Sequence, residues 1–368
     1  MKIAFYAPLK PADHPAPSGD RQMARLLIKA LRLAGHDVEI ASRLRSYIPD
    51  NLAQSLAALR AGADAETQRI AADWKHQAAP DLWFCYHPYY KAPDLIGPQL
   101  TRSFGIPYIA AEASYSGRRN IGIWAETQAS VVEAVKQARL TLCFTSRDHD
   151  GLRQIAPDAK LAMLAPFIDS AGFVSVKPTH APSRLISVAM MRKGDKFDSF
   201  KMLAQALALL GDLPWSLTVI GDGPLRCEVM ALFEGLPPDR TTWVGELSPG
   251  GVRNYLETSG IYVWPGCGEA YGLAYLEAQA AGLPVVAQHT AGVPEVVRAD
   301  ETGILTPAGD VGAFAAALRQ LLTDAVKCQA MSRAARRFAA VERSLAVAAE
   351  TMSQHIDAAL AGQPVDQR

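Results

Sequence analysis

The stretch Pro265-Gly-Cys-Gly-Glu-Ala-Tyr-Gly-Leu-Ala-Tyr-Leu-Glu-Ala-Gln-Ala-Ala-Gly-Leu-Pro-Val-Val-Ala287 predicts a strand end, a glycine-rich loop, a helix and a second strand. Apolar and small residues recur at helical spacing over 273–281. Gly282 followed by Pro284 is typical of a helix end, and the apolar run after it is typical of a buried strand. Such a unit directs the start of its helix toward the mouth of a parallel sheet.

Two carboxylates bracket the start of this predicted helix. Glu269 lies in the glycine-rich loop, and Glu277 lies eight residues later, about one turn into the helix. The first N–H groups of a helix have no partner within it, and the helix dipole is positive there, so both favour an anion. A phosphate-bearing sugar would therefore fit between the two side chains. The competing interpretation makes them ordinary loop and helix-face charges.

The composition describes a globular protein with a large core. Of 368 residues, 49% are hydrophobic and 20% are charged, and a chain of this length is typical of two domains. The formal net charge is zero, which argues against a polyanion such as duplex DNA as the main partner. The five cysteines follow no Cys-x-x-Cys spacing, so the sequence predicts neither disulfides nor a zinc site and favours a reducing cytosol.

The predicted location is the cytoplasm. Met1–Ala7 is typical of a buried strand rather than of a signal peptide. No apolar run approaches the length of about 18 residues that a membrane-spanning helix needs. A peripheral contact with the inner face of a membrane stays open because Trp74 and the pair Tyr89-Tyr90 lie beside lysines, although a solvated surface explains these residues as well.

Strand and helix patterns alternate along the chain, which predicts an α/β fold with parallel sheets. The first βαβ unit comprises a strand over Lys2–Ala7, a helix over Arg21–Ala34 and a strand over Asp37–Ala41. A long helix, with breaks near Pro49 and Gly62, is predicted over 44–79.

Two doubly wound, Rossmann-like domains are predicted to face each other across a ligand-binding cleft. The N-terminal domain spans 1–173 and the C-terminal domain spans 174–343. Two prolines within 174–183 mark the linker between them. The final helix, at about 344–368, is expected to return to the N-terminal domain.

The opening stretch resembles the Glu-x7-Glu motif of the large retaining glycosyltransferases of family 4, which have the two-domain GT-B fold. Further matching positions are Gly19, Gly221-Asp-Gly-Pro224, Gly245 and Gly292-Val-Pro-Glu295. The resemblance implies a retaining, metal-independent transferase of the hexosyltransferase type. It also implies a UDP- or GDP-type nucleotide-diphospho-sugar as donor and no other cofactor. The acceptor would be a glycan, a lipid-linked glycan or a small molecule, as in polysaccharide or glycolipid biosynthesis.

The resemblance assigns roles to both carboxylates. Glu269 would face the transferred sugar, and Glu277 would hold the ribose hydroxyls of the nucleotide. The backbone amides of Tyr271–Ala274 would hold the diphosphate. The donor-binding residues implied in this C-terminal domain are Gly245, Leu247, Ala270, Tyr271, Gly272, Leu273, Ala274 and Glu277. Carboxylates suit this task because hydrogen bonds from hydroxyls to a charged acceptor are strong where water is excluded.

A cation is expected beside the diphosphate, on the loop before the helix predicted from Ser199. Members of the family carry Gly-Arg after the preceding strand and a lysine several residues later. In this chain the arginine position reads as Met190, so Arg192 would supply a displaced guanidinium and Lys196 the ammonium. The register that uses Lys193 instead stays open, as does the interpretation that these are solvated loop charges.

The N-terminal domain is expected to contribute Gly19 and Glu112. Gly19 would let the backbone approach the diphosphate or the acceptor closely, although a turn or a helix cap explains it equally well. The family presents a histidine to the donor sugar where this chain has Glu112, which would accept a hydrogen bond from a sugar hydroxyl. His87, at the end of a predicted strand, is interpreted as a structural histidine, with a place beside the acceptor as the alternative.

A metal site and three other functions are weighed against transfer. Asp148-His149-Asp150 has the Asp-x-Asp spacing of a metal site, but it precedes a predicted helix, where a first-turn Asp is favoured without metal. Gly221-Asp-Gly-Pro224 lacks the third glycine of a dinucleotide fingerprint, so an NAD enzyme is not expected. A nucleotide-sugar epimerase and a catalytically silent sugar-nucleotide-binding subunit stay as alternatives.

Overall fold

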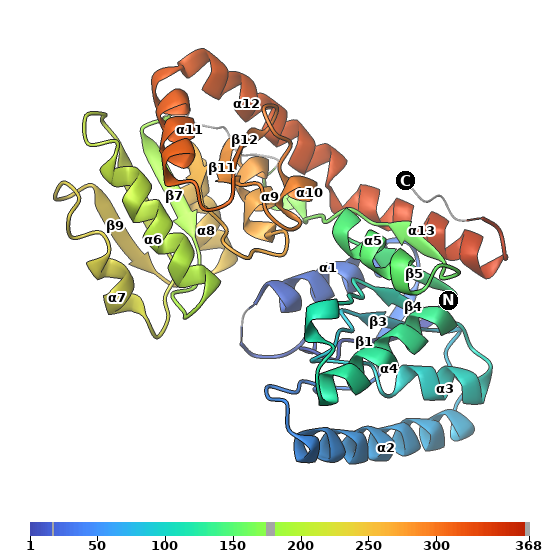
Figure 1. The fold of residues 1–368 in the computed structure, drawn as a ribbon. Helices are drawn as coiled ribbons and strands as arrows, with labels where there is room; N and C mark the ends of the chain where they lie inside the picture. The colour runs from blue at the N-terminus through green and yellow to red at the C-terminus, as the bar shows by residue number, and fades with distance from the viewer. Residues whose placement is uncertain (17, 174–180, 365–368) are drawn as a thin grey trace. The chain divides into compact units, whose positions relative to one another are not determined.

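The computed structural model describes residues 1–16, 18–173 and 181–364, which divide into two units. Unit 1 comprises Met1–Ala165 together with the chain from Leu345 onward, and unit 2 comprises Pro166–Ser344 (Figure 1). Most of the predicted linker lies outside the described residues. Residues 166–173, which the sequence assigned to the first domain, pack in unit 2, where Ser170 Oγ donates to the Ala340 carbonyl at 3.1 Å.

Unit 1 contains a six-stranded sheet in the order β2-β1-β3-β4-β5-β6, with every pair parallel. Its strands are β1 (Lys2–Tyr6), β2 (Asp37–Ile40), β3 (Leu82–Tyr86), β4 (Tyr108–Ala111), β5 (Leu140–Cys143) and β6 (Leu161–Met163). The central strands β3, β4 and β5 are buried along their whole length, as expected where helices cover both faces of a parallel sheet.

The helices of unit 1 are α1 (Gly19–Leu33), α2 (Ala53–His76), α3 (Gly97–Phe104), α4 (Ile123–Gln137), α5 (Ser146–Ile155) and α13 (Leu345–Leu360), with a short 3₁₀ turn at Gly117–Arg119. Helix α1 begins where Ser18 Oγ accepts a hydrogen bond from the Arg21 N–H at 3.2 Å. Helix α13 packs against α1, so the C-terminal helix belongs to unit 1.

The helix predicted over 44–79 is wrong in its first part, because α2 begins only at Ala53. The chain before it is held by other parts of unit 1. The Ser46 N–H donates to the Pro8 carbonyl at 2.8 Å, and the Ile48 N–H donates to the Lys91 carbonyl at 2.7 Å. These backbone groups cannot also form helical bonds, so tertiary contacts override the local helical pattern.

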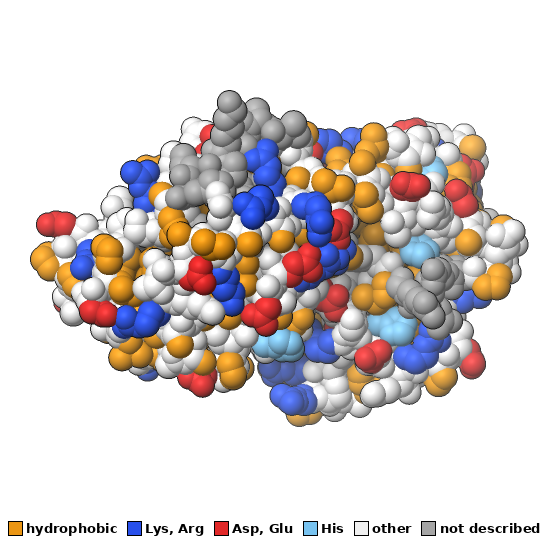
Figure 2. Space-filling model, turned by 90° about the horizontal axis from the view of Figure 1, so that it is seen from above, with side chains coloured by type: hydrophobic (Ala, Val, Ile, Leu, Met, Phe, Trp, Pro, Cys, Tyr) orange, Lys and Arg blue, Asp and Glu red, His pale blue; other side chains and the backbone are white. Residues whose placement is uncertain are grey.

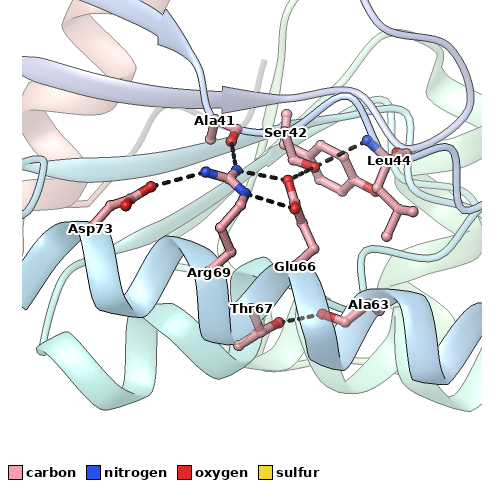
Figure 3. Close-up of polar contacts among 9 residues, drawn as sticks. Ala41, Ser42, Leu44, Ala63, Glu66, Thr67, Arg69 and Asp73 are labelled. Atoms are coloured by element: carbon pink, nitrogen blue, oxygen red, sulfur yellow. Dashed lines mark hydrogen bonds and ion pairs between the residues drawn. The ribbon is translucent and has the colours of Figure 1, made fainter.

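Polar contacts attach α2 to the end of β2 (Figure 3). Arg69 donates to both oxygens of Glu66, to Asp73 and to the Ala41 carbonyl, and Ser42 Oγ donates to Glu66 at 2.7 Å. The Arg69 side chain is 51% exposed, so screening by water keeps the contribution of these ion pairs to about 1 kcal/mol or less. The network fixes the direction of α2 more than it stabilises the fold.

Unit 2 contains a second parallel sheet, in the order β12-β11-β10-β7-β8-β9. Its strands are β7 (Arg184–Val188), β8 (Ser216–Ile220), β9 (Thr241–Gly245), β10 (Ile261–Val263), β11 (Val285–Gln288) and β12 (Gly303–Thr306). Its helices are α6 (Asp195–Ala208), α7 (Arg226–Ala231), α8 (Pro249–Glu257), α9 (Leu273–Ala280), α10 (Val293–Val296), α11 (Val311–Thr323) and α12 (Ala325–Arg337), with a π-helical turn at Phe338–Glu342 and a 3₁₀ turn at Ser170–Phe173.

The strand order reverses once in each sheet. In unit 1 the reversal lies between β1 and β3, and in unit 2 it lies between β7 and β10. The loops that leave the carboxyl ends of two such strands run to opposite faces of the sheet and leave a crevice, where open α/β sheets bind ligands. The two Rossmann-like units of the predicted fold are therefore confirmed, and each has one preferred place for a ligand.

The surface carries charges of both signs. On the face that Figure 2 shows, basic and acidic side chains are interspersed with hydrophobic ones, in keeping with the net charge of zero. Within the described part of the chain, no helix is both long enough and apolar enough to span a bilayer.

Candidate functional site

Lys196 and Glu269 form an ion pair at the point where the strand order of unit 2 reverses. Lys196 follows β7 and Glu269 follows β10, and Nζ of the lysine contacts Oε2 of the glutamate. Trp264 Nε1 donates to the same oxygen at 3.4 Å, and the Lys196 ammonium lies 5.5 Å from the centre of the Trp264 ring. The side chains of the pair are 19% and 20% exposed, so a ligand can still reach them.

The position of Lys196 differs from the prediction in one respect. The sequence placed it in a loop before a helix at Ser199, but α6 begins at Asp195 and Lys196 lies in its first turn. Gly194, at φ +81°, precedes the helix in place of a side-chain cap. The helix thus fixes the direction of the Lys196 side chain toward Glu269.

Steric constraints explain why the loop before α9 contains several glycines. Gly266, Gly268 and Gly272 have φ values of +69°, +64° and +83°, a region that L-residues with a side chain rarely adopt. A Cβ on Gly266 would lie 2.2 Å from the Tyr275 hydroxyl, and one on Gly268 would lie 2.3 Å from a carboxylate oxygen of Asp195. The backbone therefore packs closely around Glu269, as the glycine-rich sequence predicts.

The N-terminus of α9 lies beside this ion pair. Gly272 precedes the helix, no side chain caps it, and its first turn contains no acidic residue. The first N–H groups of α9 have no acceptor within the helix, so an anion placed there would accept from Leu273 and Ala274. Ala270 is exposed in the loop before them, and its carbonyl accepts from the Gly292 N–H at 2.6 Å.

Glu277 lies on α9 and is half-buried. Burial raises the pKa of Glu277 to about 7, while the positive charge of Arg253 opposes the rise. The Arg253 guanidinium lies 5.1 Å from the centre of the Phe173 ring. Arg253 was not singled out in the sequence, because only the packing of α8 places it near Glu277.

Other predicted donor residues of unit 2 lie apart from the ion pair. Gly245 ends β9, the edge strand, and its carbonyl accepts from the Gly221 N–H at 2.8 Å. Leu247 is half-buried just beyond it. Arg192 is exposed, and within the described residues it forms no ion pair, so the structure brings Lys196 but not Arg192 to Glu269.

In unit 1, Gly19 is the first residue of α1 and Glu112 directly follows β4. Glu112 is only 7% exposed and has a φ of +56°. Burial raises the pKa of Glu112 to about 7, and the positive charge of His87 opposes that rise. Gly19 has an open environment, since a Cβ added there would meet nothing within 4 Å, which suits either close approach of a ligand or a simple helix start.

The Asp-x-Asp sequence is part of a helix start. Asp148 lies in the first turn of α5, where its N–H donates to Thr145 Oγ1 at 3.1 Å and Thr145 Oγ1 donates to its carboxylate at 2.7 Å. This is the local helix-capping arrangement that the competing interpretation expected. Among the residues that the structure describes, no group of three or more His, Cys, Asp or Glu side chains could hold a metal ion.

Part of this chain is similar in sequence to known glycosyltransferases. Residues 182–324, which include β7 to α11 and the ion pair, match the family model described as glycosyl transferases group 1. The sulfoquinovosyl transferase of Arabidopsis thaliana is 33% identical over 140 residues, which are 37% of this chain and 27% of that protein. The chain thus spans about a quarter of the length of that curated relative.

Solved structures share the fold over nearly the whole chain. Sucrose-phosphate synthase from Thermosynechococcus elongatus superimposes with a TM-score of 0.75 at 18% identity, covering 99% of this chain and 100% of that chain. HepE of Anabaena, solved in complex with UDP, gives a TM-score of 0.72 at 13% identity, covering 97% of this chain and 100% of that chain. At these identities the likeness shows the fold alone, which is the GT-B arrangement of two Rossmann-like domains.

Proposed function

We propose that the protein is a retaining, metal-independent glycosyltransferase that uses a nucleotide-diphospho-sugar. The observation that carries this proposal is the Lys196–Glu269 pair beside the uncapped N-terminus of α9, at the strand-order reversal of unit 2. The match of residues 182–324 to group 1 glycosyl transferases supports it, as does the fold shared with HepE, which was solved in complex with UDP.

The proposed chemistry divides between these groups. When the bond from the sugar to the diphosphate breaks, negative charge grows on the leaving diphosphate and positive charge grows on the ring. Lys196 and the first N–H groups of α9 stabilise the diphosphate, and Glu269 orients the sugar and stabilises the ring. Glu277 accepts hydrogen bonds from the ribose hydroxyls. As the bond from the anomeric carbon to the diphosphate breaks, the acceptor oxygen bonds to the same carbon on the same face, and the leaving diphosphate takes the hydroxyl proton. No residue of the enzyme forms a covalent bond to the sugar.

Donor binding would rearrange the ion pair. In the structure the Lys196 ammonium already contacts Glu269, whereas the proposed role requires it to contact the diphosphate. The phosphate charge therefore competes with Glu269 for Lys196, and the released carboxylate becomes available to sugar hydroxyls. The base of the nucleotide is proposed to lie near Gly245 and Leu247. A cytoplasmic location, and contact with a membrane if the acceptor is lipid-linked, complete the proposal.

The test is a panel of UDP-, GDP- and ADP-sugars incubated with the purified chain. We expect slow hydrolysis of one of these donors. Glu269→Ala should lose this activity, whereas Glu228→Ala, at an exposed position on α7, should retain it. Inversion at C2 of the donor would indicate an epimerase, and binding without turnover would indicate a silent binding subunit. Full activity of Glu269→Ala would contradict the assigned role of this carboxylate.

A further inference from the structure

Unit 1 has a polar contact at its own strand-order reversal. Asp20 lies in the first turn of α1, which follows β1, and His87 directly follows β3. His87 Nδ1 lies 3.1 Å from Asp20 Oδ1, so the pair joins the two loops that diverge there. The contact occupies the same topological position in unit 1 that Lys196 and Glu269 occupy in unit 2. That position is where open α/β sheets bind ligands.

Glu112 is the neighbour of His87 on the adjacent strand. Tyr86 and Ala111 are paired in the register of β3 and β4, so the next residues of both strands lie side by side. His87 has a φ of +59° and Glu112 a φ of +56°, a conformation that costs about 1–2 kcal/mol for each residue with a side chain. Two such residues at adjacent strand ends are unusual, and backbone strain of this kind collects at binding and catalytic sites.

The ring of His87 is held in one orientation. Asp20 fixes the Nδ1 edge, and the Tyr89 ring stacks on the imidazole at 5.0 Å with an interplanar angle of 22°. Within the described residues Nε2 makes no hydrogen bond, and the side chain is 19% exposed. The ring therefore presents a fixed Nε2 edge to any ligand at this position.

The surrounding charges keep the imidazole positive. Although burial lowers it, the pKa of His87 is raised to about 9 by the carboxylates of Glu112, Asp20 and Asp148. Lys10 acts on Asp20, and Arg147 lies 3.6 Å from Asp148, so basic groups face two of these three carboxylates. His87 is thus a hydrogen-bond donor at neutral pH. A side-chain hydrogen bond from Tyr86 and the positive charge of His87 both act to lower the pKa of Glu112.

We propose that His87 and Glu112 together bind a hydroxyl group of an uncharged carbohydrate acceptor, and that Asp20 and Tyr89 orient His87 for this contact. A hydroxyl is both donor and acceptor, so it can accept from the imidazolium Nε2–H while it donates to the Glu112 carboxylate. The Glu112 carboxylate would repel a phosphate group, and the His87 imidazolium would repel an ammonium group. The pair therefore selects hydroxyls against both kinds of ion.

Aromatic side chains next to His87 favour a sugar ring as the bearer of that hydroxyl. Tyr89 contacts Tyr90 edge-to-face at 5.3 Å, and Tyr90 contacts Trp124 in the same way at 5.5 Å. All three residues are half-buried, and the Lys91 ammonium lies 5.0 Å from the centre of the Trp124 ring. This row lies wholly in unit 1, whereas the ion pair proposed for the donor lies in unit 2, and we take the row as part of the acceptor site.

The direct test follows the His87 side-chain nitrogen resonances of the ¹⁵N-histidine-labelled full chain by NMR. The probes are the methyl glycosides of glucose, galactose and mannose, with glucose 6-phosphate and glucosamine as charged counterparts. We expect a neutral glycoside to shift the Nε2 resonance of His87, at lower concentrations than either charged sugar. The inference is overturned if no neutral glycoside shifts this resonance or if glucose 6-phosphate shifts it at the lowest concentration.

Variants separate binding from folding. His87→Gln places an amide near the Nε2 position, whereas His87→Asn places one near Nδ1 and tolerates the positive φ. Because His87→Asn loses one charge-assisted hydrogen bond, we expect its acceptor KM to rise about tenfold. In His87→Gln the acceptor KM should rise less. Asp20→Asn leaves both strand ends intact and should raise the acceptor KM with little change in donor hydrolysis.

The matched control is His149→Gln. His149 also lies in unit 1, its Nδ1 lies 3.1 Å from Asp150, and its side chain is 18% exposed, but it is on a helix and not at a strand end. Its acceptor KM should equal that of the native chain. The inference rests on the proposed function, yet the two can fail separately. Absence of donor turnover in the native chain would contradict the function, whereas a raised donor KM with an unchanged acceptor KM in His87→Asn would overturn only the inference.

Discussion

Lys196 in the first turn of α6 and Glu269 in the loop before α9 form an ion pair across the reversal of strand order in unit 2. When no ligand is bound, each of the two charges is compensated by the other. A negatively charged ligand that takes Lys196 also releases the carboxylate. Recognition of phosphate and of sugar hydroxyls is thereby linked through one contact.

The first prediction concerns Lys196. Lys196→Gln removes the cation that is proposed to stabilise the leaving diphosphate, so kcat for donor turnover should fall by about 10²-fold or more. Lys201→Gln, an exposed lysine on the same helix, should retain native kcat. Steady-state kinetics with the donor from the panel provide the measurement. Loss of activity in Lys193→Gln but not in Lys196→Gln would show that the other register of this loop is the functional one.

The second prediction concerns the pH dependence of donor binding. Since the pKa of Glu277 is raised to about 7, its carboxyl group takes up a proton as the pH falls through this value. A protonated carboxyl is a weaker acceptor for ribose hydroxyls, so the donor KM should rise below pH 7 and reach a plateau above it. A donor KM that stays constant from pH 5.5 to 8.5 would argue against a ribose contact at Glu277.

The same carboxyl group gives a prediction for stability. The folded pKa of about 7 exceeds the ordinary value of 4.5, so the folded state binds the proton more tightly and loses stability as the pH rises from 4.5 to 7. Glu277→Gln removes this penalty. The variant should be more stable than the native chain at pH 8, on the order of 1–3 kcal/mol in urea unfolding, and the difference should vanish near pH 4.5. A variant of equal or lower stability at pH 8 would contradict the burial argument.

Arg253 supplies a related prediction. Its positive charge opposes the rise in the pKa of Glu277, so Arg253→Met should raise that pKa further and move the acidic limb of the donor KM profile to higher pH. The hydrocarbon of Met preserves most of the packing against Phe173. The profile of donor KM against pH measures the shift, with Arg240→Met as a control because Arg240 stacks on Trp215 elsewhere in unit 2. An unshifted limb would show that Arg253 acts only in packing.

The last prediction compares two glycines to separate the stability cost of a steric clash from the cost of a positive φ. Gly272 and Gly309 have similar φ values of +83° and +78°, but a Cβ on Gly272 would lie 2.7 Å from the Tyr275 ring, whereas one on Gly309 meets nothing within 4 Å. Gly309→Ala should cost about 1 kcal/mol of stability through its φ alone. Gly272→Ala should cost clearly more and should weaken donor binding. Equal losses of stability in urea titrations would mean that the loop before α9 yields to the added atom.

Much of unit 2 could be predicted because its local patterns and its tertiary structure agree. The helix predicted over 273–281 in the opening stretch differs from α9 by one residue at its end. Gly282 ends that helix with a φ of +87°, as its position before Pro284 indicated. Here the turn residues and the hydrophobic periodicity predict the same end of the helix, and such agreement makes a prediction from sequence reliable.

The residues that sequence reasoning missed depend on long-range contacts. The pattern over 44–52 predicts a helix, but the Ser46 and Ile48 amides bond to the carbonyls of Pro8 and Lys91, and no local signal identifies these distant acceptors. The contact of His87 with Asp20 exists because β1 and β3 are neighbours although β2 lies between them in sequence. The sequence shows that His87 directly follows a buried strand and precedes a proline. Only the strand order shows that this position lies beside Asp20.

The return of α13 to unit 1 makes unit 2 an insertion within the chain of unit 1. Residues 166–344 form one continuous segment, whereas unit 1 needs both ends of the chain to complete itself. The buried face of α13, which includes Met352 and Ile356, covers α1, and His355 Nε2 lies 3.2 Å from the Met163 carbonyl. Unit 1 therefore forms its full set of contacts only when α13 is present, whereas residues 166–344 contain the whole of unit 2. Removal of α13 would expose the apolar surface of α1 that it covers, while every residue of unit 2 would remain present.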